Sequence, residues 1–227
     1  ADVSEIYSRP RIAQAAAEHH HGGEQLRPGW SLDLTTLDPV TGEAWDLSRT
    51  EVQKRVMKLV ETTKPLFLIG SPPCTAFSPL QRLSRHRRNP AVVEEELRAG
   101  RVHLEFCMKL YAAQVEQGRF FIHEHPHDAE SWLERSVLKV AAMENVNIAV
   151  VDMCAYGMKA DTGPVRGAAR KRTKIMSNSY EVLKRIKAQC PNSSSDKSTH
   201  HVHVPLESGK AKRCQVYPRA FSRQVCS

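Results

Sequence analysis

Residues 65–78 read PLFLIGSPPCTAFS: an unbroken apolar run, a glycine, and two prolines placed directly before Cys74. An apolar run without alternation is typical of a strand that is buried on both faces of a parallel sheet. The two prolines stiffen the turn that follows, because each ring fixes its own backbone φ angle. We therefore predict a strand over residues 65–70 whose carboxyl end presents Cys74 at a defined place beyond the sheet.

The chain on both sides of this stretch alternates between short apolar runs and longer segments with helical spacing of apolar residues. The predicted strands cover residues 5–8, 29–34, 119–123, 147–153 and 174–177, and the predicted helices cover 10–20, 48–60, 90–117, 131–144 and 180–189. This alternation favours an α/β fold with a mainly parallel central sheet and helices on both faces. We place the fold in residues 1–190 and expect residues 191–227, which begin with a polar linker, to pack on or beside it.

The charge balance favours an anionic partner. Lys and Arg number 33 against 25 Asp and Glu, which leaves a formal net charge of +8. A basic surface attracts nucleic acid, although many basic proteins only carry solvated lysines. The six cysteines form no CxxC pair, which indicates reduced thiols in an intracellular protein. No run approaches the roughly 18 apolar residues of a membrane-spanning helix, and residues 1–10 do not resemble a signal peptide, so we expect no membrane partner. The missing initiator Met suggests a piece of a larger polypeptide.

Three polar clusters follow predicted strands, and the carboxyl ends of parallel strands are where α/β proteins bind ligands. Cys74 follows the first of these strands, and a thiolate near a basic neighbour acts as a nucleophile. A single cysteine is otherwise often a small buried hydrophobic residue. Glu124, in the sequence RFFIHEHP, suits acid–base chemistry or belongs to a polar loop. The third cluster is Tyr156-Gly157, with a basic stretch over residues 166–174.

Taken together, these motifs resemble the C5-cytosine methyltransferase family. The segment GSPPCTAFS looks like the family's catalytic cysteine motif, and Glu124, Tyr156-Gly157 and Arg172 follow in the family's order over residues 60–180. The resemblance implies a Rossmann-like class I methyltransferase fold and the cofactor S-adenosylmethionine. It also implies that Cys74 adds to C6 of cytosine, that Glu124 hydrogen-bonds N3 and the exocyclic amine, and that Arg172 lies near O2.

The resemblance also implies where the cofactor binds. Asp33 matches a ligand of the ribose hydroxyls and Asp46 a ligand of the adenine amine. The full set of implied cofactor-binding residues is Tyr7, Ser8, Asp33, Asp46, Ser71 and Pro72. The sequence departs from the family in residues 5–10, EIYSRP, where the family carries a glycine-rich loop.

Residues 79–90, PLQRLSRHRRNP, match a mobile loop of the family that closes over an extruded base. The arginines suited to phosphate contacts are Arg82, Arg85, Arg87 and Arg88. The expected partner is nucleic acid, DNA rather than RNA, and the expected location is the nucleus rather than the cytoplasm. Because only a short segment follows the arginine motif, target recognition needs another domain. Two other interpretations remain open: a methyltransferase-like binding module without catalysis, and an amino-methyltransferase that uses the Ser71-Pro72-Pro73 motif.

The tail contains several residues that can bind zinc, namely Cys190, His200, His201, His203 and Cys214. Their spacing matches no standard zinc pattern. We therefore predict no metal site from the sequence, and leave open whether Cys190, His200 and His203 bind zinc.

Overall fold

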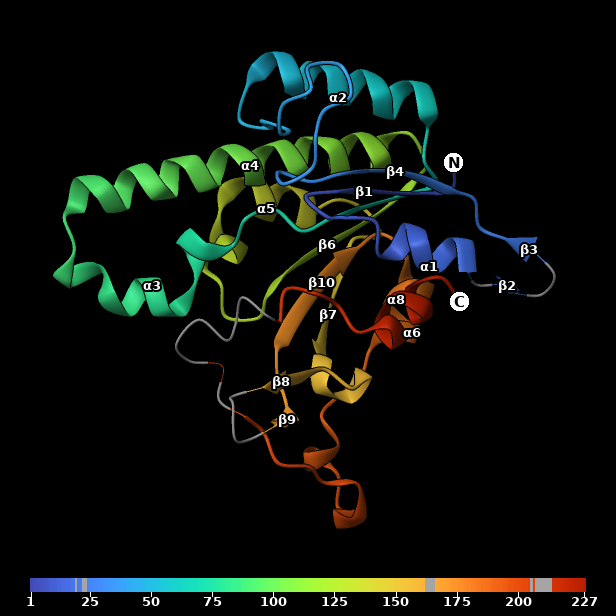
Figure 1. Cartoon of the computed structure of the whole chain (residues 1–227), viewed down its shortest axis with the longest axis vertical. Coiled ribbons are helices and arrows are strands. Elements are labelled where there is room, and N and C mark those ends of the chain that lie inside the picture. The colour runs from blue at the N-terminus through green and yellow to red at the C-terminus, as the bar shows by residue number, and fades with distance from the viewer. Residues whose placement is uncertain (19, 22–23, 162–165, 205, 207–213) are drawn as a thin grey trace.

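The computed structural model describes every residue except 19, 22–23, 162–165, 205 and 207–213. Its centre is a six-stranded sheet with the order β4-β1-β5-β6-β10-β7 (Figure 1). The strands are β1 (Val3–Ile6), β4 (Pro28–Leu32), β5 (Phe67–Gly70), β6 (Phe120–Pro126), β7 (Asn147–Asp152) and β10 (Arg172–Ser177). Neighbours from β4 to β6 are parallel, and β10 is antiparallel to both β6 and β7. The predicted α/β fold with a mainly parallel sheet is confirmed.

Helices cover both faces of this sheet because successive strand side chains point in opposite directions. Leu68 and Ile69, adjacent in β5, belong to two separate apolar clusters. One face packs against α2 (Thr50–Thr63), α4 (Pro90–Glu116) and α5 (Arg135–Ala141), and the other against α1 (Ile12–Glu18), α6 (Tyr180–Ile186) and α8 (Arg219–Val225).

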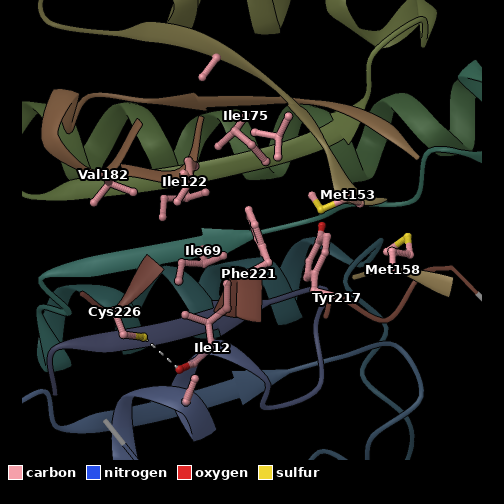
Figure 2. Packing of buried hydrophobic residues seen from close by; sticks show 14 of the residues in the cluster. Ile12, Ile69, Ile122, Met153, Met158, Ile175, Val182, Tyr217, Phe221 and Cys226 are labelled. Carbon is pink, nitrogen blue, oxygen red and sulfur yellow. Dashed lines mark hydrogen bonds between the residues drawn. The ribbon is translucent and has the colours of Figure 1, made fainter. Parts of the chain in front are cut away.

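The tail contributes to one of these two clusters. Figure 2 shows Phe221 of α8 beside Ile12 of α1 and close to Ile69 of the sheet. The Cys226 thiol, at the end of α8, lies 3.6 Å from the carbonyl oxygen of Ile12. The last helix of the chain is therefore packed against the first.

The long helix α4 begins and ends at residues that favour those positions. Asn89 accepts a hydrogen bond from the backbone N–H of Ala91, and Pro90 occupies the first turn, where its missing N–H costs nothing. Gly118, just beyond the helix, has a φ of 68°, in the left-handed region that glycine adopts readily.

The segment between β5 and α4 differs from the expected mobile loop. It forms α3 (Pro79–Ser84) and a 3₁₀ turn over Arg85–Arg87. Ser78 explains the difference, because its hydroxyl accepts a hydrogen bond from the Gln81 N–H at 3.3 Å and Pro79 suits the first helical turn.

Shorter elements complete the fold. The strand pairs are β2 (His20–His21) with β3 (Glu24–Gln25), and β8 (Lys159–Asp161) with β9 (Arg166–Ala168). Among the helices of the described residues, none is both long enough and apolar enough to cross a membrane.

The strand order places a crevice at one point of the sheet. The chain passes from β1 to β4 on one side and then to β5 on the other side of β1. Where the order reverses in this way, the loops at the carboxyl ends of the two strands diverge and leave room for a ligand. That point lies between the turn after Ile6 and the turn after Gly70.

Candidate active site

A pocket of about 260 Å³ lies at this reversal of strand order. It is lined by the turns after β1, β4 and β5, by β6, and by two segments from later in the chain. The sequence-predicted residues that line it are Tyr7, Ser8, Asp33, Ser71, Pro72, Cys74 and Glu124. Asp46 and Arg172, predicted from the same resemblance, do not line this pocket.

Cys74 lies at the start of a 3₁₀ turn over Thr75–Phe77, directly after the two prolines. Burial raises the pKa of its thiol above the ordinary value, and the negative charge of Glu124 raises it further. The Lys171 ammonium acts in the opposite direction without cancelling these effects. The thiol is therefore protonated at neutral pH until a ligand or a base changes its surroundings.

Glu124 projects into the same pocket from β6 and is almost completely buried. Burial acts to raise its pKa, but the Lys171 ammonium and a hydrogen bond from Tyr217 outweigh burial and hold the pKa below the usual value. The Lys171 Nζ lies 3.3 Å from Oε1 of Glu124. Within the described residues Oε1 nevertheless has no well-formed hydrogen bond. A buried anionic oxygen is thus available to a donor on a ligand.

Lys171, rather than Arg172, is the cation that pairs with Glu124 in this pocket. Arg172 opposes Asp152 of β7 in the sheet register, and its Nε lies 3.6 Å from that carboxylate. Successive residues of an extended chain point to opposite sides, so Lys171 faces Glu124 instead. Lys171 was not predicted, because it is one of several cations in RGAARKRTK and the sequence does not show which of them faces the pocket.

Tyr217 reaches the pocket from the tail and was not predicted. Its hydroxyl lies 3.0 Å from the Ser71 Oγ, and its presence beside Glu124 lowers the pKa of that carboxyl. The Lys171 Nζ lies 5.3 Å from the centre of the Tyr217 ring, in the range of a cation–π contact. Figure 2 shows the same ring packed near Met153 and Phe221. No local sequence pattern marks this tyrosine, because its role depends on how the tail folds back.

His125 supports the turn that carries Cys74. Its Nε2 lies 2.9 Å from the carbonyl oxygen of Pro72, which can only accept, and its Nδ1 lies 2.6 Å from the Ser131 Oγ. The ring therefore donates from Nε2 and accepts at Nδ1, which is a neutral tautomer. Burial lowers the pKa of His125 to about 4, in agreement with a neutral ring.

This buried histidine predicts a pH dependence of stability. Between its ordinary pKa of 6.5 and about 4, the unfolded chain binds a proton that the folded chain excludes, so stability falls as the pH falls. His123, also buried with a lowered pKa, adds to the effect. We expect urea midpoints to decline from pH 7 to pH 4, and His125→Gln to make the decline shallower. An exposed control, His86→Gln, leaves the decline unchanged; an identical decline in both variants contradicts the assignment.

A carboxylate of β1, Glu5, holds the turn that follows this strand. Both oxygens of buried Glu5 are bonded: Oε1 accepts from the N–H groups of Arg11 and Ala13 at 2.8 Å each, and Oε2 accepts from Ser8. Burial raises the pKa of Glu5, and these hydrogen bonds oppose the rise. Tyr7 follows with a φ of 56°, a backbone conformation uncommon for a non-glycine residue. The amino end of α1 is therefore already occupied by a side chain.

The two aspartates of the predicted cofactor site lie apart. Asp33, after β4, lines the pocket and accepts a hydrogen bond from the Thr35 N–H at Oδ1. Asp46 lies before α2, where its carboxylate accepts from the N–H and hydroxyl of Ser48. These hydrogen bonds lower the pKa of Asp46.

The four predicted phosphate-binding arginines lie on α3 and the 3₁₀ turn after it. Arg85 forms an ion pair with Glu130, and Arg88 forms one with Glu96 at 2.5 Å. Arg82 and Arg87 are exposed. The segment thus presents two solvent-facing guanidinium groups directly after the Cys74 turn.

Comparisons with known proteins give little further information. No protein-family model matches the chain, and no curated protein matches its sequence. Among solved structures, the Entamoeba histolytica methyltransferase EhMeth matches with a TM-score of 0.39 and 10% sequence identity. The match covers 78% of this chain and 52% of that chain, so this chain spans about half the length of that neighbour.

Proposed function

We propose that this protein methylates C5 of cytosine in nucleic acid, with S-adenosylmethionine as methyl donor and Cys74 as the nucleophile. One observation carries the proposal: a thiol, a buried carboxylate and the ammonium group that pairs with it line one pocket at the reversal of strand order. A thiol adds readily to the polarised C5=C6 bond of a pyrimidine, and the carboxylate can receive the donors of the cytosine edge.

Each group has a stated role in the reaction. The Cys74 thiol loses its proton, which ends on N3 of the cytosine, and the sulfur forms a bond to C6 while the electrons of the C5=C6 bond move towards C5 and N3. Glu124 accepts the hydrogen bond of the exocyclic amine at Oε1 and holds the protonated N3, which stabilises the base as the thiolate adds. Lys171 holds Glu124 in position; we assign to it the cationic role that the resemblance implies for Arg172. After methyl transfer, loss of the C5 proton to a base restores the double bond and releases Cys74.

The pocket residues fit S-adenosylmethionine, which supplies an electrophilic methyl group on a sulfonium when bound. In dinucleotide-binding proteins of related topology, backbone N–H groups at the first helix bind a pyrophosphate. Here the Glu5 carboxylate fills that place and repels a phosphate. S-adenosylmethionine carries no phosphate, but its α-carboxylate is also an anion, so we expect its α-ammonium group rather than its α-carboxylate to lie near Glu5.

Asp33 is the residue we assign to the ribose hydroxyls. An acidic side chain at the end of the strand beside β1 is placed to accept those hydrogen bonds, and its Oδ2 is not used by Thr35. Tyr7, Ser8, Ser71 and Pro72 form the adjoining walls. Asp46 lies outside this lining, and we assign it no cofactor contact.

Asp33→Ala tests this assignment. Losing a charged hydrogen-bond acceptor costs about 1.5–3 kcal/mol, which corresponds to roughly 10- to 100-fold weaker binding. We expect that loss in S-adenosylmethionine binding measured by calorimetry. Glu43→Ala, which removes an exposed carboxylate outside the pocket, serves as control. Wild-type affinity in Asp33→Ala contradicts the assignment.

Nucleic acid is the proposed substrate because the chain carries a net charge of +8 and presents Arg82 and Arg87 beside the Cys74 turn. A cytosine must leave the base stack before a thiol can reach C6. DNA is the expected form, and a further domain is the expected source of sequence recognition.

A binding module without catalysis is the second candidate, favoured by the β1–α1 turn, which has no glycine and in which Tyr7 adopts a positive φ. One experiment separates the candidates. The wild-type chain is incubated with S-adenosylmethionine and a pool of 5-fluorocytosine oligonucleotides, single- and double-stranded. We expect a covalent complex that survives denaturation, because fluorine at C5 blocks the final elimination. Binding without a covalent complex favours the module, and methylation without a complex favours amino-methyl transfer.

A further inference from the structure

Four metal-ligating side chains meet beyond the carboxyl end of β7. They come from three separate segments. These are a 3₁₀ turn over Met153–Tyr156, the loop that follows α6, and the tail that follows a second 3₁₀ turn over Lys197–Thr199. The residues are Cys154, Cys190, His201 and His203, and their ligand atoms all lie within 4.8 Å of one another.

The spacing of these atoms suits one tetrahedral ion. Zinc bonds of about 2.3 Å to sulfur and about 2.0–2.1 Å to nitrogen place tetrahedral donors roughly 3.3–3.8 Å apart. The Cys190 Sγ lies 3.3 Å from Nε2 of His203 and 3.6 Å from Nε2 of His201. The two Nε2 atoms lie 3.0 Å apart, so they must separate by a few tenths of an ångström when the ion binds. We propose that Cys154, Cys190, His201 and His203 bind a structural zinc ion.

The surrounding backbone fixes the ligands before any ion binds. The Asn192 side chain bonds both to the N–H of His201, at 2.9 Å, and to its carbonyl oxygen, at 2.8 Å. The N–H of Cys190 donates to the buried Asp152 carboxylate at 3.0 Å. Such contacts beyond the ligands orient them and limit the loss of conformational freedom on binding.

The neighbouring histidine and cysteine of the tail lie elsewhere. Nε2 of His200 lies 3.0 Å from the carbonyl oxygen of Ser194. Cys214 is buried in the apolar cluster that contains Phe221. The site therefore includes Cys154 and His201, excludes His200, and departs from the sequence prediction of no metal.

The donor set favours zinc in a closed site. Two sulfur and two imidazole ligands suit zinc, and four protein ligands leave no position for substrate or water. Binding converts two thiols to thiolates and releases two protons, so the two thiolate charges balance the ion. Imidazole stays neutral and contributes its Nε2 lone pair.

The site ties together segments that also shape the active-site pocket. The N–H of Met153, next to Cys154, donates to the carbonyl oxygen of Lys171 at 3.1 Å. On either side of His203, Val202 accepts a hydrogen bond at its carbonyl oxygen from the Ala168 N–H at 3.1 Å, and the Val204 N–H donates to the carbonyl oxygen of Ala168 at 2.9 Å. Zinc would hold the tail against the segment that carries Lys171. Removal of the zinc ion is therefore expected to destabilise the whole fold.

The experiment uses the full chain purified under reducing conditions with zinc supplied. We expect about one zinc per chain by elemental analysis. Chelation lowers the melting temperature, and added zinc restores it. Cobalt in place of zinc gives the intense visible absorption of a tetrahedral thiolate site. None of these three readouts depends on methyl transfer.

Matched variants locate the site. Cys190→Ser and His203→Ala lose the bound zinc, whereas Cys214→Ser and His200→Ala retain it. Because Cys190→Ser can fail to fold, the cobalt spectrum of the wild-type chain provides a second measurement. Absence of metal from wild type, retention of metal in His203→Ala, or loss of two of the six thiols to a Cys154–Cys190 disulfide overturns the proposal.

Discussion

Cys74→Ser is expected to lower methyl transfer by at least about 10³-fold and to abolish the covalent complex with 5-fluorocytosine DNA. A serine hydroxyl is a far weaker acid than a thiol, and the Cys74 environment already raises the pKa of the group that must lose a proton. The substitution keeps size and turn geometry, so S-adenosylmethionine binding should be retained.

Cys226→Ser is the matched control, because that cysteine lies at the end of α8 and contacts Ile12 rather than the pocket. It should keep both the covalent complex and turnover. Methylation by Cys74→Ser at a rate near that of wild type contradicts nucleophilic catalysis and supports transfer to an exocyclic amine.

Lys171→Met is expected to destabilise the chain by about 3–5 kcal/mol. The change removes the cation that offsets the burial of Glu124, and leaves a carboxylate in the pocket without its closest positive charge. Burial then dominates and the pKa of Glu124 rises. Urea unfolding at pH 7 measures the loss, and Glu124→Gln combined with Lys171→Met should recover most of it.

The difference in stability between wild type and Lys171→Met should depend on pH. The pKa of Glu124 is lowered in the folded chain, so the stability it contributes is present above its ordinary pKa of 4.5 and is lost as the pH falls through the folded value. Wild type and Lys171→Met should therefore converge in stability at low pH.

Arg172→Met is the neighbouring control. Arg172 is about half exposed and shares Asp152 with Arg170, so we expect a loss of no more than about 1 kcal/mol. Equal stability of Lys171→Met and wild type contradicts the buried ion pair. A larger loss of methyl transfer in Arg172→Met than in Lys171→Met returns the catalytic role to Arg172.

The strands of the sheet could be predicted from the sequence because a strand buried on both faces has an unbroken run of apolar residues. The run PLFLIG predicted β5, and the long amphipathic segment before Gly118 predicted α4. The helix α3 in the arginine segment was not predicted, although Ser78 and Pro79 favour a helix start at that position. The antiparallel direction of β10 leaves no mark in its own sequence.

The pocket was predictable only in part. Cys74 and Glu124 follow strands directly, so the position of each along the chain also fixes its position in space. Tyr217 depends on how a long tail folds back, and Lys171 depends on which residue of a basic run faces inward. The zinc ligands come from residues 154–203, which is why no short-range spacing motif reveals them.

The contribution of Tyr217 has a consequence for the order in which the molecule is made. Every strand of the sheet has been synthesised before residue 217, yet the hydroxyl that lies 3.0 Å from the Ser71 Oγ is then still missing. The Arg11 guanidinium likewise lacks its hydrogen-bond acceptor, the carbonyl oxygen of Gln215, until that residue is synthesised. A nascent chain can therefore form its sheet while its pocket stays open, and residues 215–217, which are synthesised after every strand of the sheet, complete the binding site.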